Sequence, residues 1–203
     1  MQSPAIFPLF YLPPVSYFSA LQANDFNVII EAHEHFPKQT YRNRTRISSP
    51  NGPLDLFIPV VKGSKVHTVV KDVKISYDFK WQRLHWLSLQ NAYRNSAYFE
   101  YYEDELAPFY EKQYEFLYDY NLELFQWALK KLKKPAEITF TSEYVKDTGS
   151  SVDFRDKLNY KNTEETFPAK PYFQVFEDRN GFMANLSIVD LLFSQGPQAK
   201  NHL

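Results

Sequence analysis

Residues 38–47 (KQTYRNRTRI) hold the densest set of potential ligand-binding side chains in the sequence. Arginines stand at positions 42, 44 and 46, and side chains two residues apart share one face of a β-strand. A guanidinium group is a planar fork of donors that suits phosphate or carboxylate. We therefore expect this block to bind an anionic small molecule, although a solvated strand face with surface ion pairs would use the same residues. The expected contact residues are Lys38, Gln39, Tyr41, Arg42, Asn43 and Arg44.

A His-Glu-His sequence, residues 33–35, directly follows an apolar stretch. Imidazole titrates near neutral pH, so His33 is a candidate general base. Two imidazoles and a carboxylate would also suit a metal ion, which makes metal-dependent hydrolysis an alternative. No third, distant ligand accompanies them, however, and we assign no metal site.

A second cluster, residues 81–86 (WQRLHW), combines aromatic, basic and imidazole side chains. On a helix, Trp81 and His85 would share a face that could stack a ring and accept a proton, so His85 is a second candidate base. Arg83 adds a cation for the substrate, and Tyr11 and Tyr17 are expected to line the pocket. The two tryptophans could equally anchor the helix to a sheet.

The composition excludes several functional classes. A formal net charge of -1 argues against a general nucleic-acid binder. The absence of cysteine excludes disulfides, thiolate catalysis and cysteine-ligated metals. With five glycines the chain has no glycine-rich phosphate loop, so any phosphate must be held by side chains. Prolines interrupt the first residues, which resemble neither a signal peptide nor a membrane span, and we expect a cytoplasmic location.

The pattern of apolar residues predicts an α/β fold. Residues 5–11 and 26–32 read as buried strands that enclose a short helix over residues 15–23, which is the order found in parallel sheets. Residues 41–48 and 54–61 flank an Asn-Gly pair that tolerates the positive φ angles of a hairpin turn. Further helices are expected over residues 81–93, 97–111, 115–134 and 188–193, and further strands over residues 69–76, 136–141 and 172–177.

These elements predict one α/β domain over residues 1–203, with a small, mostly parallel sheet, an added β-hairpin and a helical layer. Composition turns polar after residue 144, so residues 145–203 could instead form a loop-rich C-terminal extension.

Several blocks together carry a family resemblance. They are YLPP at residues 11–14, FNVIIEAHEHFPKQTYRNRTRI at 26–47, the Asn51-Gly52 turn with IPV at 58–60, and WQRLHW at 81–86. The chain resembles the WbqC-like family over nearly its whole length, and residues 98–102 and 185–196 are similar to Bacteroidetes members. More usual members have Asp-Asp where this chain has Glu31 to His33, and Trp in place of Tyr41, which bears on specificity more than on fold.

The resemblance implies a role in bacterial surface-polysaccharide (O-antigen-type) biosynthesis. We expect a transferase acting on an activated sugar, with aminoacyl or glycine transfer as a specific form. The anionic ligand would then be a nucleotide sugar or a sugar phosphate. A non-catalytic protein that binds an anion or a glycan in the same pathway is the alternative, and the sequence specifies neither a cofactor nor an oligomeric state.

Overall fold

A three-stranded parallel sheet organises the N-terminal half of the molecule. The computed structural model describes residues 5–61, 68–134, 136–149, 151–160 and 170–203. Strands β1 (Ala5–Pro8), β2 (Asn27–Glu31) and β5 (Glu137–Phe140) lie in the order β1-β2-β5, with both neighbouring pairs parallel. Helix α1 (Val15–Ala23) connects β1 to β2, so the predicted strand–helix–strand unit is confirmed.

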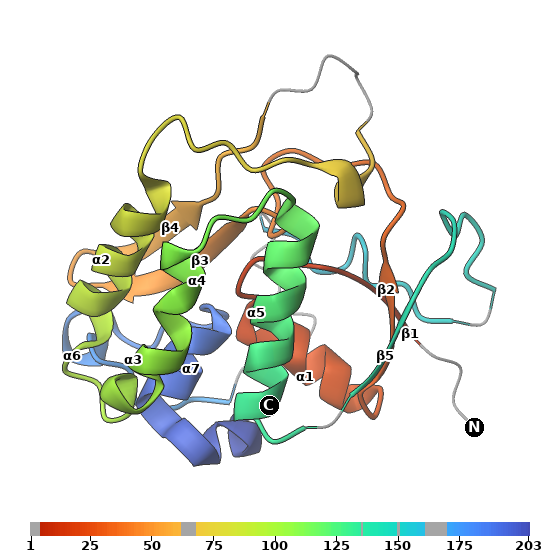
Figure 1. The fold of residues 1–203 in the computed structure, drawn as a ribbon. Helices are drawn as coiled ribbons and strands as arrows, with labels where there is room; N and C mark the ends of the chain where they lie inside the picture. The colour runs from red at the N-terminus through yellow and green to blue at the C-terminus, as the bar shows by residue number, and fades with distance from the viewer. Residues whose placement is uncertain (1–4, 62–67, 135, 150, 161–169) are drawn as a thin grey trace.

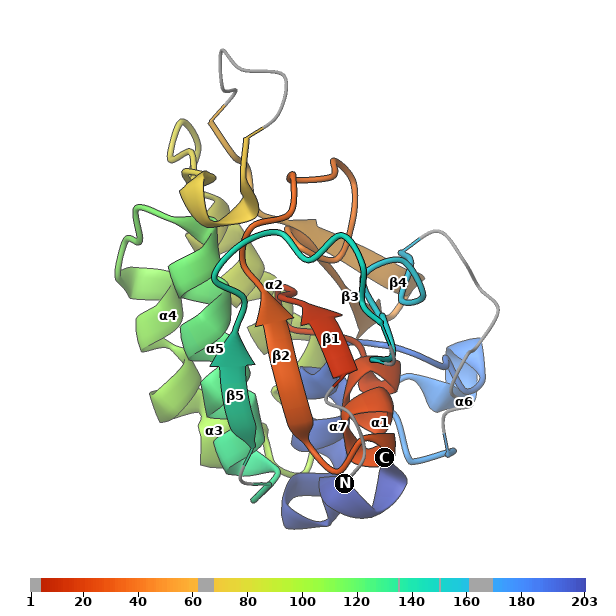
Figure 2. The ribbon, with the colours of Figure 1, turned by 90° about the vertical axis from the view of Figure 1, so that its right-hand side faces the viewer.

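Helices cover one face of this sheet (Figures 1 and 2). In Figure 2 the three strands lie side by side, and α1 and α5 pack behind them. The remaining elements are η1 (Val70–Asp72), α2 (Trp81–Tyr93), α3 (Phe99–Leu106), α4 (Pro108–Glu111), α5 (Leu117–Lys131), α6 (Glu177–Asn180), α7 (Ile188–Gln195) and η2 (Gly196–His202). Among the described residues, no helix has the length and apolar character needed to cross a membrane.

The predicted hairpin forms a separate two-stranded antiparallel sheet. Strands β3 (Arg44–Ser49) and β4 (Gly52–Phe57) pair in register, and Gly52 leaves the turn with a φ of 100°, which favours glycine. Thr45 and Ile47 point into the core. The first strand begins at Arg44, three residues later than predicted, so Arg42 lies in the preceding turn. The expectation that Arg42 shares a strand face with the next two arginines is therefore wrong.

The predicted helices are confirmed, except that one of them is split into two. Helix α2 has the predicted bounds, and the helix expected over residues 97–111 is two helices that meet at Pro108. Proline lacks the N–H of a continuing helix but fits the first helical position, so Pro108 begins α4.

Two predicted strands are wrong. Residues 69–76 form the 3₁₀ turn η1 and single bridges to His35, Val60 and Phe116, so their backbone pairs with three different segments instead of one strand. Residues 172–177 make no ladder, and their buried side chains Tyr172 and Gln174 instead bind the carboxylate of Asp190.

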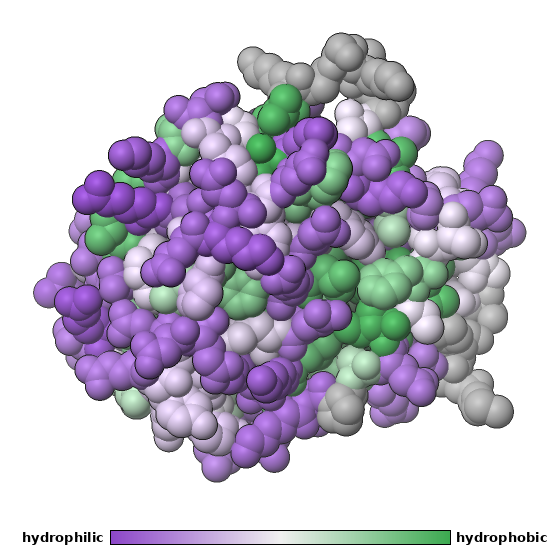
Figure 3. All heavy atoms as spheres, in the orientation of Figure 1, coloured by the Kyte–Doolittle hydropathy of each residue, from purple (hydrophilic) through white to green (hydrophobic). Residues whose placement is uncertain are grey.

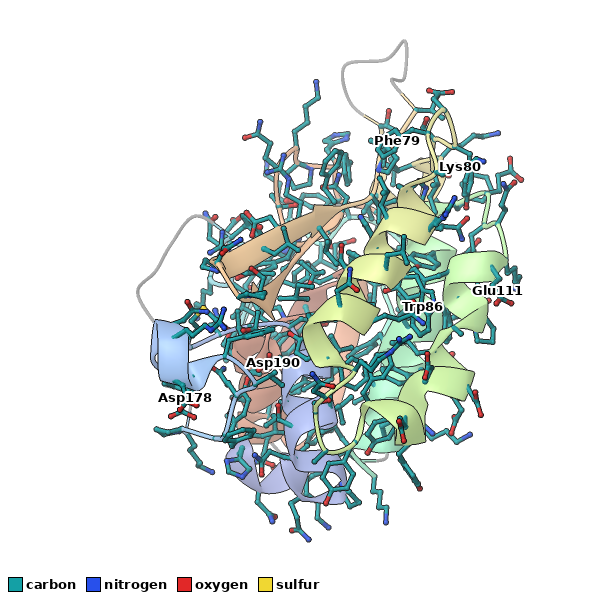
Figure 4. The ribbon with its side chains drawn as sticks, turned by 90° about the vertical axis from the view of Figure 1, so that its left-hand side faces the viewer. Phe79, Lys80, Trp86, Glu111, Asp178 and Asp190 are labelled. Atoms are coloured by element: carbon teal, nitrogen blue, oxygen red, sulfur yellow. The ribbon has the colours of Figure 1, made fainter. Side chains whose placement is uncertain are left out.

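Asp190 is the central polar group of the C-terminal part of the core. Its fully buried carboxylate accepts hydrogen bonds from the hydroxyls of Tyr93 at 2.7 Å and Tyr172 at 2.8 Å. Figure 4 shows Asp190 inside the molecule, whereas Asp178 lies on the outside of α6. Burial raises the pKa of Asp190 to about 6, against the lowering effect of its hydrogen bonds.

This raised pKa predicts an unusual pH dependence for Asp190→Asn. The folded protein binds the Asp190 proton more tightly than the unfolded chain does. This proton therefore adds its full stabilisation below the pKa of Asp190 in the unfolded chain, and the stabilisation is lost as pH rises through about 6. The substitution should therefore cost about 1 kcal/mol more at pH 5 than at pH 7.5. Urea unfolding at both pH values measures this, with the exposed Asp178→Asn as control. A cost that is equal at the two pH values would contradict the assignment.

Candidate functional site

The carboxyl ends of β2 and β5 meet at one edge of the parallel sheet. Figure 2 shows the chain segments that leave these strands turning over the same edge. Open α/β sheets bind their ligands at this edge, because loops and helix N-termini converge there. Charged residues from distant parts of the sequence also meet at this edge.

Glu31, the last residue of β2, is fully buried and its carboxylate is saturated with hydrogen bonds. It accepts bonds from the backbone N–H of His33 at 2.8 Å and the hydroxyl of Thr141 at 2.8 Å. The guanidinium of Arg155 reaches it at 3.1 Å and also forms an ion pair with Asp153 at 2.6 Å. Glu31 therefore ties β2 to the segment after β5, and it is not free to act as a base.

Glu34 and Arg42 form a buried, two-pronged ion pair. The Nε and Nη2 atoms of Arg42 each lie 2.6 Å from a carboxylate oxygen of Glu34. Burial raises the pKa of Glu34, and the hydrogen bonds and charge of Arg42 oppose that effect. Asn121 of α5 donates to the Arg42 carbonyl at 2.7 Å, and the guanidinium lies over the ring of Phe10. Arg42 thus has a partner inside the protein and does not offer its donors to a ligand.

Arg44 and Arg46 share the solvent-facing side of β3. Arg46 pairs with Asp55 on β4, with its Nε 2.7 Å from a carboxylate oxygen. The ring of Tyr160 covers both arginines, 5.9 Å from Cζ of Arg44 and 4.9 Å from Cζ of Arg46. Arg44 makes no ion pair with any described residue, and its Nε is buried without a hydrogen-bond partner among them. Its guanidinium is the one of the three that remains available in the described structure.

His85 lies in a buried aromatic cluster. Its Nδ1 is 3.0 Å from the hydroxyl of Tyr11, which in turn is 3.0 Å from the hydroxyl of Tyr110. Trp81 packs edge-on against His85, as helical spacing predicts. Burial lowers the pKa of His85 to about 4, although a backbone hydrogen bond with Phe57 acts in the opposite direction. His85 is therefore neutral at pH 7 and shielded from solvent.

The other predicted residues fall into two groups. Tyr17 and Tyr41 are buried, with the Tyr17 hydroxyl donating to the Pro8 carbonyl, and Asn43 donates to the Ile58 carbonyl. These residues lie with Tyr11 around the start of β3, since the N–H of Tyr11 donates to the Tyr41 carbonyl at 2.9 Å. Lys38, Gln39 and Arg83 are exposed, and His33 is half-buried at the edge of the sheet. In the described part of the chain, no three His, Asp or Glu side chains gather as metal ligands.

A cleft of about 550 Å³ opens beside the edge of the sheet. Its lining includes Ala32, Lys71, Asp72, Tyr118, Asp119 and Phe140. Apart from the strand end at Ala32, sequence reasoning did not select this region. A usable signal was present, because a helix predicted to start near residue 115 and a strand predicted to end at residue 141 should meet at one sheet edge.

The buried pair predicts contrasting effects for neighbouring arginines. Arg42→Ala leaves Glu34 buried without its counter-charge and should lower the free energy of unfolding by about 3–5 kcal/mol. Arg44→Ala, the matched control, removes no ion pair and should cost about 1 kcal/mol or less. Urea unfolding measures both variants. The apolar double variant Glu34→Leu/Arg42→Met should recover much of the loss, and equal effects of the two single variants would refute the pair's importance.

The lowered pKa of His85 predicts acid sensitivity. Stability from its neutral state is present above the unfolded pKa of 6.5 and is lost as pH falls toward about 4. Relative to His85→Gln, the wild-type protein should therefore lose about 2 kcal/mol between pH 7.5 and pH 5. Unfolding curves at both pH values test this, with the exposed His35→Gln as control. Parallel curves for wild type and His85→Gln would count against a buried neutral imidazole.

Comparison with known proteins places these features in a family. The model of the WbqC-like protein family matches residues 10–174. The "Uncharacterized protein Rv1507c" of Mycobacterium tuberculosis is 27% identical over 231 residues, covering 100% of this chain and 98% of the relative. No solved structure matches the chain. Because the family model spans most of the sequence, including the 38–47 block and the WQRLHW helix, the chain belongs to the WbqC-like protein family.

Proposed function

We propose that this protein is a transferase that acts on an activated sugar in bacterial surface-polysaccharide biosynthesis. The activated sugar carries a phosphate or a nucleoside diphosphate. Aminoacyl transfer is the specific reaction that we favour. A sugar hydroxyl or amine attacks the carbonyl of an activated acyl donor, a base removes its proton, and the donor's leaving group departs as the ester or amide forms.

The observation that carries this proposal is the available guanidinium of Arg44. Arg46 and Asp55 form an ion pair, and Arg44 acts on Asp55 only through longer-range electrostatics, so Arg44 leaves an excess positive charge on this face. A half-buried guanidinium keeps a stronger attraction for an anion than one in open water. Phosphate suits its planar donors, and an ion pair with phosphate would supply the missing partner.

Aromatic rings beside Arg44 favour a ligand that carries a ring as well as a charge. Phe57 stands directly opposite Arg44 in the hairpin, is 49% exposed and contacts Phe79. Tyr160 covers the other side of the arginine pair. A nucleobase could stack on Phe57 while its phosphates bind Arg44, which supports a nucleotide-linked sugar over a simple inorganic anion.

Of the two histidines, His33 is the better candidate for proton transfer. It is partly exposed at the carboxyl edge of the sheet, where its backbone N–H is held by Glu31. His85 is buried, and a pKa of about 4 makes it a weak base at neutral pH. We assign His85 and Tyr11 to positioning the start of β3 and the end of β4 through the backbone of Phe57.

A non-catalytic binding protein is the alternative function. The pairing of Arg42 with Glu34 and of Arg155 with Glu31 and Asp153 favours it, because these charges are already satisfied inside the protein. In this case Arg44 would bind the same anionic ligand without any turnover.

Arg44→Ala tests the binding proposal. Isothermal titration calorimetry with UDP, GDP and dTDP should detect binding of at least one nucleotide to the wild-type protein. The loss of a charge-assisted contact should weaken that binding about tenfold or more, while thermal stability remains close to wild type. Arg94→Ala, at an exposed arginine that ends α2, is the control and should bind like wild type. Equal nucleotide affinity in Arg44→Ala and wild type would rule out this site.

A turnover assay separates the two functions. The protein is incubated with the corresponding nucleotide sugars and with activated aminoacyl donors, and products are followed by mass spectrometry. Product formation that falls in His33→Ala but persists in His35→Ala supports the transferase. Saturable binding without product supports the binding protein.

A further inference from the structure

The cleft beside the carboxyl edge of the sheet contains a second set of ligand-type groups. It lies between the ends of β2 and β5, the 3₁₀ turn η1 and the first turn of α5. Figure 3 shows that apolar side chains gather on the face of the molecule over β5 and beside α5. None of the lining residues belongs to the Arg44 face, so the cleft is a separate site.

The walls of the cleft combine phenyl rings with carboxylates. Phe140 is 47% exposed, and Phe116 also lines the cleft. Asp72, Asp119 and Lys71 are exposed and form no ion pair with any described residue. Two carboxylates and one ammonium group leave an excess of negative charge, which disfavours a phosphate at this position.

These groups have the donors and acceptors that a sugar ring requires. Ionised carboxylates only accept hydrogen bonds, so Asp72 and Asp119 call for a ligand with several hydroxyl donors. The amine of Lys71 can donate to a ring or hydroxyl oxygen. The apolar C–H face of a sugar can pack on Phe140, and a cleft of about 550 Å³ has room for one or two sugar rings.

Some buried polar atoms of α5 lack a hydrogen-bond partner among the described residues. Tyr118 lines the cleft with 9% of its surface exposed, and its hydroxyl has no hydrogen-bond partner among the described residues. Asn121 lies one turn further along α5, and its side-chain oxygen is also buried without a described partner. Native proteins satisfy most such groups, so the unpartnered hydroxyl of Tyr118 is consistent with a hydroxyl group or an ordered water next to it.

We propose that this cleft binds a neutral, hydroxylated sugar ring. Phe140 packs on the apolar face of the ring, Asp72 and Asp119 accept hydrogen bonds from its hydroxyl groups, and Tyr118 forms part of the wall beside them. The site goes beyond the proposed nucleotide contact at Arg44, and it would hold the uncharged part of a substrate or a glycan acceptor. The two sites share no residue, so either can exist without the other.

Saturation-transfer NMR with free monosaccharides tests this site. The probes are glucose, galactose and N-acetylglucosamine, added without nucleotide to the full-length protein. We expect saturation transfer from the wild-type protein to at least one sugar, with a dissociation constant on the order of 1 mM, as is usual for a small neutral ligand. Phe140→Ala should weaken this binding about tenfold or more, and Asp119→Asn should weaken it about threefold or more.

Matched variants elsewhere on the surface control for general effects. Phe173→Ala removes a phenyl ring that is 63% exposed, and Asp178→Asn neutralises an exposed carboxylate on α6. Both controls should bind sugar like the wild-type protein. Sugar binding that weakens only in the cleft variants supports the proposal. If Phe140→Ala does not fold, the result for Asp119→Asn is the deciding one.

Two results would overturn the site: no saturation transfer to any of the three sugars, or equal binding in the cleft and control variants. UDP binding by Arg44→Ala is measured separately and without sugar. Failure of the cleft therefore leaves the nucleotide proposal intact, and failure of the nucleotide proposal leaves the cleft intact.

Discussion

The buried ion pair between Glu34 and Arg42 is the constraint on which the arrangement of this molecule depends. Two charges removed from water are tolerated only when each fully satisfies the other, and here both prongs of the guanidinium meet the carboxylate at 2.6 Å. The pair joins the segment after β2 to the segment before β3, and Asn121 attaches α5 to the same point. Sheet, hairpin and longest helix are thereby held in one relative position, which also defines the faces available to ligands.

Two other buried ionisable groups act in opposite directions. Burial favours the neutral form of both, so Asp190 keeps its proton up to a pH of about 6, and His85 is without its proton above a pH of about 4. Acidification through the range between pH 6.5 and pH 4 therefore weakens the His85 region while it strengthens the Asp190 region. Each group binds tyrosine hydroxyls, so the high tyrosine content of the chain serves to satisfy buried polar groups as well as to pack the core.

The accessible chemistry divides between two surfaces with different charge. On the hairpin, Arg44 supplies a positive charge beside exposed aromatic rings, which suits an anion attached to a ring. At the edge of the sheet, the cleft supplies carboxylates beside aromatic rings, which suits a neutral molecule with many hydroxyl groups. An activated sugar has both kinds of group. The two surfaces together therefore fit the activated sugar that we propose as the substrate.

Local patterns were sufficient for most of the fold. The β1–α1–β2 unit, the hairpin and helix α2 follow from apolar periodicity, proline positions and the Asn-Gly turn, all of which act over a few residues. The predictions of strands over residues 69–76 and 172–177 were wrong because a strand must pair with a free sheet edge. Only the complete fold determines whether such an edge lies close enough.

The candidate site was likewise predictable only in part. The residue pattern was enough to identify an arginine-rich block, two candidate histidines and the lack of a glycine-rich loop. It did not show that Arg42 is paired and Arg44 is not, because Glu34 lies eight residues away and meets Arg42 only when the chain turns back after β2.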